Sequence, residues 1–466
     1  MSRRRIFGTD GVRGKANQSL TVELALQLGT AAGGWIHTHP VAIAANEEER
    51  RPHVIIGRDT RISCDMLECA LSAGLTSMGV DVVSVGVAPT PAVSHAVLTS
   101  GAAAGIVISA SHNPFDDNGI KFFGPDGKKL PDSVEDQIQS ILESPGTVDM
   151  PTGGGLGTLR ANPTLIDHYI QHVIATVPQQ EGGALPLAGL SLVLDCANGA
   201  AYDIAPRVFE ALGAIVTTIH ASPSGVNINL DCGSTRPAEM AALVASTGAS
   251  AGLAFDGDAD RVMIADENGG IVDGDRMMAI IAGELHRTGR LAGNLVVATI
   301  MSNVGLEQAL QRIGVTLYRT DVGDRYVSEA MVAFGASIGG EQSGHILLPD
   351  ITPTGDGIVT GLQVLHVAMQ RGRKLSELAS VVQNCPQRLI NIRVIDKNAW
   401  ASDSDVQDAI QHGYAKLGNE RWLSVRPSGT ESLVRVMAQG PDGSIVDLVV
   451  NEISSLIRGR YGVSPN

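Results

Sequence analysis

The sequence has few aromatic residues, few cysteines and no long apolar run. Aromatic residues make up only 3% of the 466 positions, which excludes the stacking platforms that bind single-stranded nucleic acids. No run of about 18 apolar residues occurs, so we expect no segment that spans a membrane. The basic start of the chain lacks the apolar core of a secretory signal peptide, so we expect a cytoplasmic protein.

The cysteines are too few and too scattered for a disulfide framework. Cys64, Cys69, Cys196, Cys232 and Cys385 are odd in number and show no C-x-x-C spacing. This usage is typical of a reducing compartment.

Basic residues are also in deficit. The chain has 34 Lys and Arg against 49 Asp and Glu, a formal net charge of −15. This charge disfavours nonspecific binding to nucleic acids and anionic membranes. An anionic substrate must then be attracted by a local cluster of arginines and lysines, which we expect near the site of chemistry.

Three segments share one pattern of expected elements. In each, an apolar β-branched run is followed by a polar corner, a helical pattern, a glycine and a second β run, starting at Val54, Leu192 and Leu295. The pattern predicts three strand-helix-strand units with parallel strands. We therefore expect three related mixed α/β domains and a smaller C-terminal α+β domain, at residues 1–160, 161–266, 267–384 and 385–466. Asn162-Pro163 predicts a helix through about Val177, with Asn162 as its N-cap.

The most informative motif is an acidic loop between two short apolar runs. Asp256, Asp258 and Asp260 stand at alternate positions, and Arg261 follows at once. In extended backbone these three carboxylates point the same way. Three carboxylates this close repel one another unless a cation binds between them, and hard oxygen ligands suit Mg²⁺ or Ca²⁺. With Arg261 as an anion-binding group beside it, the loop indicates a metal site that handles phosphate.

Two other interpretations compete with the metal site at this loop. An EF-hand needs a glycine at its sixth position, where Arg261 stands, and helices on both sides rather than the expected strands. A solvated acidic turn is the simpler alternative, but the alternation favours the metal site.

A second motif is the corner that follows the apolar strand 106–108. It presents Ser111 and His112 before the turn at Asn113-Pro114. Neighbouring side chains diverge in extended backbone, and no G-x-S-x-G motif is present, so a hydrolase pair is disfavoured. Ser111 is either an ordinary turn serine or a hydroxyl that carries a group. Lys121 lies inside the next apolar strand, where a lysine is costly unless it is paired or functional.

Three further loops carry polar groups suited to a phosphosugar. Residues 340–345 offer a carboxylate, a hydroxyl and an imidazole for sugar hydroxyls, from Glu341, Ser343 and His345. Residues 426–432 form a Gly/Ser/Thr loop whose backbone amides can surround a phosphate, with Arg426 and Arg435 as bidentate donors. The N-terminal loop 8–14 adds Arg13.

Taken together, these motifs resemble those of the α-D-phosphohexomutase superfamily, in that family's order and over nearly the whole chain. Residues 109–114 look like its phosphoserine loop, 256–261 its metal loop, 340–345 its sugar loop and 426–432 its phosphate loop. Residues 6–14 and 115–123 look most like the branch that acts on glucosamine phosphates. One position departs from the pattern, because the resemblance predicts a basic residue where Asp321 stands.

The resemblance implies the fold, the cofactor and the site residues. It implies four domains around a central cleft, a phosphorylated Ser111, and Mg²⁺ bound by Asp256, Asp258, Asp260 and the Ser111 phosphate. It implies that Lys121 is the general acid/base, with His112 and Arg13 beside it. Sugar hydroxyls would contact Glu341 and Ser343, and the distal phosphate would contact Arg426, Ser428, Gly429, Thr430 and Arg435.

The implied activity is the reversible conversion of glucosamine 6-phosphate to glucosamine 1-phosphate through the 1,6-bisphosphate. This step would supply UDP-N-acetylglucosamine for cell-envelope precursors, and the resemblance also suggests a homodimer. The nearest alternative is a phosphomannomutase/phosphoglucomutase. A phosphatase using the same phosphoserine and a non-catalytic phosphosugar-binding regulator are the other two hypotheses.

Overall fold

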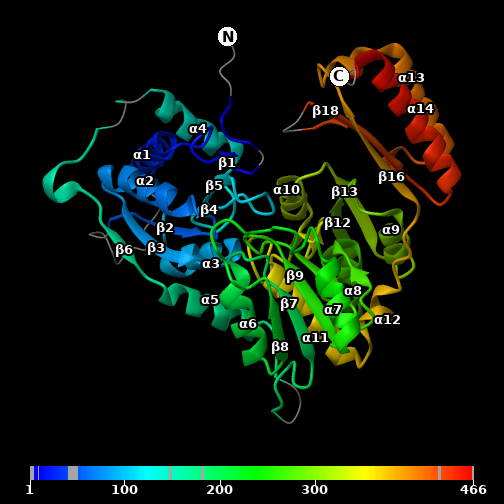
Figure 1. The fold of residues 1–466 in the computed structure, drawn as a ribbon, viewed down its shortest axis with the longest axis horizontal. Coiled ribbons are helices and arrows are strands. Elements are labelled where there is room, and N and C mark those ends of the chain that lie inside the picture. Colours follow the sequence, from blue (N-terminus) through cyan, green and yellow to red (C-terminus); the bar gives the residue numbers. More distant parts are fainter. Residues whose placement is uncertain are drawn as a thin grey trace.

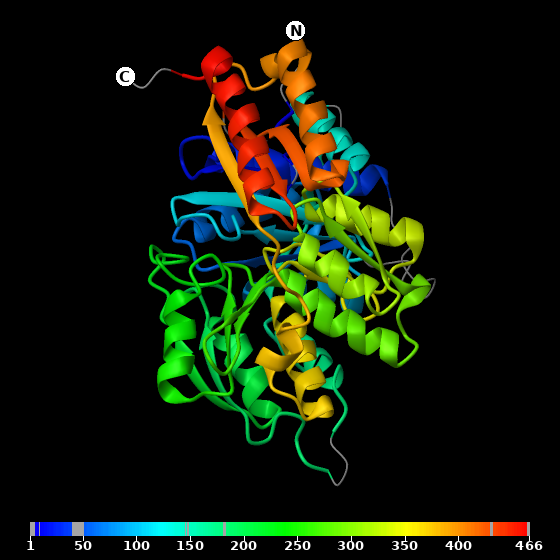
Figure 2. The same ribbon diagram turned by 90° about the vertical axis from the view of Figure 1, so that its right-hand side faces the viewer.

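The computed structural model describes residues 5–8, 10–39, 51–144, 146, 149–179, 183–428 and 432–463. Their strands form four separate sheets of six, five, four and three strands. The sheets follow one another along the chain, and the C-terminal part stands beside the third sheet in both views (Figures 1 and 2). In this part of the chain, no helix is both long enough and apolar enough to cross a bilayer.

The first sheet has the strand order β1-β5-β4-β2-β3-β6. Its elements are β1 (Val12–Lys15), α1 (Val22–Thr38), β2 (His53–Arg58), α2 (Cys64–Ser77), β3 (Asp81–Val87), α3 (Thr90–Ser100), β4 (Ala104–Ile108), β5 (Asp117–Phe123), α4 (Asp132–Glu143) and β6 (Leu159–Ala161). Along β2, Val54 and Ile56 belong to the core that α1, α2 and α4 cover, whereas Ile55 belongs to the core that contains α3. Because both faces are covered, the strand is an unbroken apolar run rather than an alternating one.

The second sheet has the order β11-β10-β9-β7-β8. Its elements are α5 (Thr164–Ala175), β7 (Ser191–Asp195), α6 (Ala201–Ala211), β8 (Ile215–Ile219), α7 (Ala238–Thr247), β9 (Ala251–Phe255), β10 (Val262–Ala265) and β11 (Ile271–Val272). The predicted helix after Asn162 is α5, but its capping residue is Pro163, which already has helical backbone angles. Asn162 instead accepts a hydrogen bond from the Thr164 hydroxyl at 2.6 Å.

The third sheet has the order β13-β12-β14-β15. Its elements are α8 (Gly274–Arg287), β12 (Leu295–Thr299), α9 (Val304–Gln311), β13 (Thr316–Thr320), α10 (Asp324–Phe334), β14 (Gly339–Gly340), β15 (Ile346–Leu347), α11 (Gly357–Arg371) and α12 (Leu375–Ala379). Short 3₁₀ turns occur at Gly153–Gly155, Ala292–Asn294, Ala399–Ser402 and Glu420–Trp422.

The first three sheets share one topology, which confirms the repeat predicted from the sequence. In each, the predicted strand-helix-strand unit forms a parallel pair: β2 with β3, β7 with β8 and β12 with β13. A third parallel strand adds to the first strand of the pair and then turns back as an antiparallel hairpin: β4–β5, β9–β10 and β14–β15. The loops at these three hairpins are residues 109–116, 256–261 and 341–345. The topology therefore presents the Ser111, acidic and sugar loops at equivalent places in three sheets.

The C-terminal domain has its own core and makes polar contacts with residues 300–304 of the third domain. Its elements are β16 (Gln387–Arg393), α13 (Ser404–Leu417), β17 (Leu423–Pro427), β18 (Leu433–Gln439) and α14 (Gly443–Tyr461), with the antiparallel order β16-β18-β17. Its apolar core is separate from the continuous core that runs through the first three domains. Buried Gln439 accepts from the Val304 amide at 2.9 Å and donates to the Ser302 carbonyl at 3.1 Å. The residues 300–304 that it holds therefore form the joint between the third and fourth domains.

A buried carboxyl on α8 beside this joint leads to a prediction about stability. Asp275 is fully buried and accepts from the Asn303 amide at 2.7 Å. Burial, with repulsion from Asp273, raises the pKa of Asp275 to about 7. Between pH 4 and 7 the folded chain thus keeps a proton that the unfolded chain has lost, so stability falls as pH rises through this range. We expect Asp275→Asn to flatten this dependence and to raise the free energy of unfolding by about 1–3 kcal/mol at pH 8, measured by urea unfolding from pH 4 to 8. A steeper dependence in the variant would contradict the assignment.

Candidate active site

A cleft of about 940 Å³ lies between the domains and is lined by residues from all four. The first three domains contribute the N-terminal loop, the Ser111 corner, the acidic loop and the sugar loop, and the fourth contributes β17 and β18. The predicted site residues in its lining are Arg13, His112, Asp260, Arg261, Glu341, Ser343, Arg426, Ser428 and Arg435. Loops separated by hundreds of residues in the sequence therefore share one cavity.

Ser111 lies directly against the acidic loop. Its Oγ donates to Asp256 Oδ2 at 2.6 Å and lies 3.3 Å from His112 Nδ1. Ser111 has a φ of 53°, in the left-handed region that non-glycine residues seldom adopt. Strained backbone of this kind is typical of functional corners.

The left-handed corner at Ser111 is held by donors from two other segments, of which Arg61 is buried and Asn229 is partly buried. The guanidinium of Arg61, which is 1% exposed, donates to the Ser111 carbonyl at 3.0 Å, and Asn229 donates to the same oxygen at 2.8 Å. Asp59 pairs with Arg61 at 2.9 Å and accepts from Ser109 Oγ at 2.7 Å. A Cβ at Gly257 would collide with the Ser111 carbonyl oxygen, so a glycine is required where the two loops touch.

The acidic loop is buried at the base of the cleft. Asp256, Asp258 and Asp260 are 0%, 0% and 4% exposed, and one ligand oxygen from each lies within 4.8 Å of the others. Burial raises the pKa of Asp256 well above its ordinary value, and the charges of Asp260 and Asp258 raise it further. For Asp260, burial is outweighed by His345 and Lys121, which hold its pKa well below the ordinary value.

This donor set fits a divalent metal ion. Asp258 Oδ1 and Asp260 Oδ1 are buried and have no hydrogen-bond partner among the described residues. Unpaired carboxylate oxygens in an interior are costly, and a hard cation satisfies several of them at once. The Ser111 hydroxyl beside Asp256 adds a further oxygen from another domain. The three aspartates and Ser111 could therefore hold such an ion together.

Lys121 occupies the same buried pocket as the acids. It is 1% exposed, and its Nζ lies 2.8 Å from Asp258 Oδ2, 3.7 Å from Asp260 Oδ2 and 3.3 Å from Asp10 Oδ2. Burial alone would lower the pKa of Lys121, but the carboxylates of Asp10, Asp258 and Asp260 outweigh it and raise the pKa. The lysine inside an apolar strand is thus paired, and its partners Asp258 and Asp260 belong to the acidic loop.

His112 and Arg13 lie at the entrance to this pocket. Burial lowers the pKa of His112 to about 4, with contributions from the nearby cations Arg261 and Arg13. The imidazole is therefore neutral at neutral pH and can accept or donate a hydrogen bond beside Ser111. Arg13 forms an ion pair with Asp10 and lines the cleft.

The sugar loop is attached to the acidic loop by its backbone. The Val262 amide donates to the Gly344 carbonyl at 3.2 Å, and a Cβ at Gly344 would overlap the Val262 oxygen. Glu341 faces the cleft, where its carboxylate accepts from Ser343 Oγ at 3.2 Å and from the Gly323 amide at 3.1 Å. His345 is instead turned inward, 3.5 Å from Asp260 Oδ1. The structure thus separates His345, which neighbours the acids, from Glu341 and Ser343, which are open to a ligand.

The fourth domain presents two arginines side by side. Arg426 on β17 and Arg435 on β18 are directly opposite in the hairpin register, an arrangement that is unfavourable for like charges without an anion. Burial and Arg435 lower the pKa of Arg426, whereas the acid Asp321 favours its charge. Ser428 lies next to Arg435, with Nη2 to Oγ at 3.4 Å. Gly429 and Thr430 lie outside the described residues.

The sequence reasoning missed a set of charged residues that joins the domains around the cleft. Lys129 pairs with Asp10 and, at 2.5 Å, with Asp324 of the third domain, whereas Thr90 Oγ1 donates to Asp258 at 2.6 Å. Asp59 and Arg61, which hold the Ser111 corner, were also missed, although the polar run 57–61 after the first apolar strand was a signal for them, since the carboxyl ends of parallel strands meet at one edge of a sheet. No comparable local signal marks Asp10, Lys129 or Asp324.

The fold and the cleft define a phosphohexomutase, and the comparisons agree. Profiles described as phosphoglucomutase/phosphomannomutase alpha/beta/alpha domains I, II and III match residues 4–148, 167–270 and 273–385, and the corresponding C-terminal domain matches 389–456. The chain belongs to the phosphoglucomutase/phosphomannomutase family, whose members are isomerases of the phosphomutase class, and within it to the phosphoglucosamine mutases.

The narrower placement rests on full-length relatives. The phosphoglucosamine mutase of Desulforudis audaxviator is 48% identical over 453 residues, 97% of each chain. That of Thermoanaerobacter sp. is 48% identical over 458 residues, 98% of this chain and 99% of the relative. That of Mesorhizobium japonicum is 47% identical over 452 residues, 97% of each chain.

Solved structures support the four-domain fold. A phosphoglucomutase/phosphomannomutase family protein from Burkholderia thailandensis superimposes with a TM-score of 0.80 at 23% identity, covering 98% of both chains. The N-acetylphosphoglucosamine mutase of Aspergillus fumigatus, solved with GlcNAc-6P and magnesium, has a TM-score of 0.64 at 18% identity, covering 98% of this chain and 96% of that one.

Proposed function

We propose that this chain interconverts glucosamine 6-phosphate and glucosamine 1-phosphate through a phosphorylated Ser111 and a glucosamine 1,6-bisphosphate intermediate. The observation that carries the proposal is the 2.6 Å hydrogen bond between Ser111 Oγ and Asp256 Oδ2, which brings a single hydroxyl onto a buried acidic triplet. We propose that the reaction takes place in the cytoplasm, where its product is used to make UDP-N-acetylglucosamine for cell-envelope precursors. Domains at 1–160, 161–266, 267–384 and 385–466 and a homodimer are part of the proposal.

In the forward direction, the phosphoryl group moves from Ser111 Oγ to the sugar O1. The Oγ–P bond breaks, an O1–P bond forms, and the O1 proton leaves the sugar. The 1,6-bisphosphate then reverses its orientation, and its O6 phosphoryl group returns to Ser111. Phosphoryl transfer of this kind depends on alignment and charge stabilisation more than on covalent assistance.

Asp256, Asp258, Asp260 and the Ser111 phosphate would hold Mg²⁺. When bound there, the ion neutralises charge on the acidic loop and on the transferring phosphoryl group. Magnesium and GlcNAc-6P occur together in the Aspergillus fumigatus relative, which supports this choice. Binding of the ion would offset the charges of Asp258 and Asp260, which act after Asp10 in raising the pKa of Lys121. In the proposed cycle Lys121 takes the O1 proton and later returns one to O6.

The substrate's non-reacting end is assigned to the two remaining loops. The Glu341 carboxylate accepts hydrogen bonds from the sugar hydroxyls, and the Ser343 hydroxyl exchanges hydrogen bonds with them. The distal phosphate is bound by residues of the fourth domain: Arg426, Ser428, Gly429, Thr430 and Arg435. Arg261 adds positive charge between them. The separate core of the fourth domain supports a closure that retains the bisphosphate while it turns.

A substrate panel tests this function. With Mg²⁺ and catalytic 1,6-bisphosphate, we expect kcat/KM for glucosamine 6-phosphate to exceed the values for glucose 6-phosphate and mannose 6-phosphate by at least about tenfold. Equal or higher rates on glucose or mannose phosphates would favour the phosphomannomutase/phosphoglucomutase alternative. Release of inorganic phosphate at the rate of substrate loss would indicate a phosphatase, and binding without turnover would indicate a regulator.

A further inference from the structure

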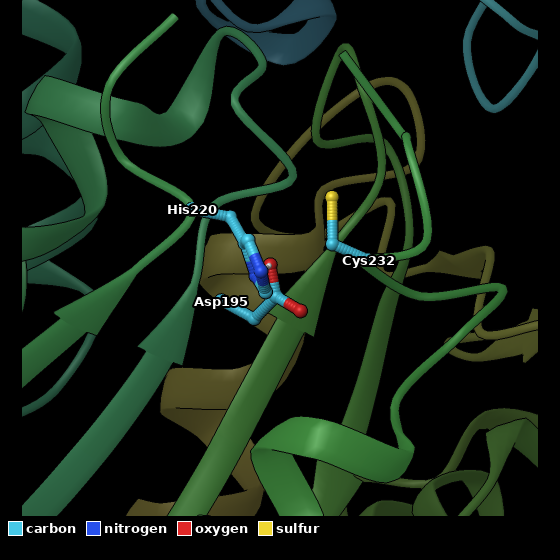
Figure 3. Close-up of side chains that lie close together, drawn as sticks. All are labelled: Asp195, His220 and Cys232. Atoms are coloured by element: carbon cyan, nitrogen blue, oxygen red, sulfur yellow. Dashed lines mark ion pairs between the residues drawn. The ribbon is translucent and has the colours of Figure 1, made fainter. Parts of the chain in front are cut away.

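A second group of metal-ligating side chains lies in the second domain, away from the lining of the cleft. Asp195 ends β7, His220 directly follows β8, and Cys232 lies in the long loop before α7 (Figure 3). One ligand atom from each residue lies within 4.8 Å of the others. The parallel pairing of β7 and β8 brings Asp195 and His220 to one sheet edge, although 24 residues intervene between them.

The ring of His220 lies between two carboxylates. Its Nδ1 lies 3.1 Å from Asp195 Oδ1, yet this buried nitrogen makes no hydrogen bond of suitable geometry within the described chain. Its Nε2 faces the Glu239 carboxylate at 3.5 Å. A histidine that binds a metal through one ring nitrogen commonly donates the N–H of the other to a carboxylate, which fixes the tautomer.

The backbone around the group is already fixed. Asp195 accepts from the Ala197 amide at 2.9 Å and from the Gly233 amide at 2.8 Å. These bonds position the carboxylate between the strand ends and the residue after Cys232. His220 has a φ of 48°, a left-handed conformation that the surrounding structure must impose. In Figure 3 the sulfur of Cys232 is turned away from the other two side chains, and rotation about its χ1 torsion changes that direction.

We propose that Asp195, His220 and Cys232 form a transition-metal site, with Zn²⁺ as its ion. A thiolate, an imidazole and a carboxylate suit borderline-soft Zn²⁺ and do not suit Mg²⁺. Zn²⁺ prefers four ligands, and a water would be the fourth. Solvent reaches the site beside His220, whose side chain is 23% exposed. Binding displaces the thiol proton of Cys232 to solvent and changes no oxidation state.

A metal at this site holds in place the loop 229–234, which supports Ser111. Asn229 lies three residues before Cys232, and it donates to the carbonyls of Ser111 at 2.8 Å and Asn113 at 3.1 Å. The Ser234 amide donates to the Phe255 carbonyl at 2.8 Å, directly before the acidic loop. A metal at Cys232 therefore stiffens both neighbours of the reacting serine without touching the substrate.

The test is zinc binding by the full-length chain in excess Mg²⁺, which occupies the acidic loop. Dialysis against chelator first removes bound metal, and Zn²⁺ is then added back. We expect elemental mass spectrometry to find one Zn²⁺ per chain. In competition with a chromophoric chelator, affinity should fall at least about tenfold in Cys232→Ser, His220→Ala and the exposed Glu239→Gln. Cys69→Ser and His412→Ala, which alter an exposed cysteine and an exposed histidine elsewhere, should bind as the parent chain does.

Cobalt provides a spectroscopic readout of the proposed thiolate ligand. Co²⁺ bound to the parent chain should show a thiolate-to-cobalt charge-transfer band in the near ultraviolet, and Cys232→Ser should lack it. Absence of the band in the parent chain, or equal zinc affinity in the parent and in Cys232→Ser and His220→Ala, would overturn the site. Neither result would bear on the mutase activity, which the substrate panel measures separately.

Discussion

Ser111→Ala and Ser111→Gly are both expected to lower mutase kcat by at least about 10³-fold, because each removes the oxygen that accepts the phosphoryl group. The pair separates chemistry from backbone strain. Ser111 has a φ of 53°, a conformation that glycine adopts more easily than alanine or serine. We therefore expect Ser111→Gly to be folded at least as stably as the parent chain, and yet to be inactive. Activity is measured with glucosamine 6-phosphate, Mg²⁺ and 1,6-bisphosphate, and stability by thermal unfolding.

A matched control for this prediction is Ser77→Ala on α2, a serine outside the cleft lining whose hydroxyl donates to the Gly74 carbonyl of its own helix. It should retain activity. Mass spectrometry of the parent chain should also find a phosphoryl adduct on the peptide that contains Ser111. Near-parental turnover in either Ser111 variant would refute the proposed role.

Asp256→Asn is expected to have opposite effects on metal binding and on the metal-free fold. Loss of one charged ligand should weaken Mg²⁺ activation at least about tenfold. In the metal-free protein, however, burial and repulsion from Asp260 and Asp258 raise the pKa of Asp256. The folded state then holds a proton that the unfolded chain releases, so ionisation of Asp256 costs stability as pH rises above its ordinary pKa. The amide removes that cost while it can still accept from Ser111 Oγ.

Two titrations check the Asp256→Asn prediction. The Mg²⁺ dependence of the initial rate gives the metal affinity, and thermal unfolding in chelator at pH 8 gives the metal-free stability. Asp350→Asn, a change at an exposed carboxylate outside the cleft lining, should alter neither. An unchanged magnesium titration together with a lower unfolding temperature would show that Asp256 is a structural acid and not a ligand.

The local features of the fold could be predicted because they depend on neighbours in the chain. The run 54–56 predicts a strand covered on both faces, and glycines such as Gly79, with a φ of 77°, mark the helix ends before the second strands. The alternation of Asp256, Asp258 and Asp260 between two apolar runs predicts a strand-loop-strand hairpin, and the structure has β9 and β10 there. The prediction of α5 was correct for the helix but not for its cap, because the Asn162 side chain accepts from the Thr164 hydroxyl instead of from a backbone amide of the first turn.

The partners across the cleft could not be predicted in the same way. Arg61 reads as one more charge after a strand, yet it is buried and holds the Ser111 carbonyl. His345 looked like a sugar contact, but the fold turns it toward Asp260. Which charges meet depends on how separate sheets pack, and residues such as Asp10 and Asp324 carry no pattern of their own.

The sequence by itself determined the repeated strand-helix-strand units, the acidic hairpin loop and the serine corner, because hydrophobic periodicity and turn chemistry act over a few residues. Only the tertiary structure decided that the same hairpin of three sheets faces one cleft, so that Ser111, Lys121 and the acids meet. It also decided that Asp195, His220 and Cys232 lie close together, outside the lining of that cleft. Those contacts join residues far apart in the chain, and they exist only once the sheets have packed against one another and excluded water from the charges between them.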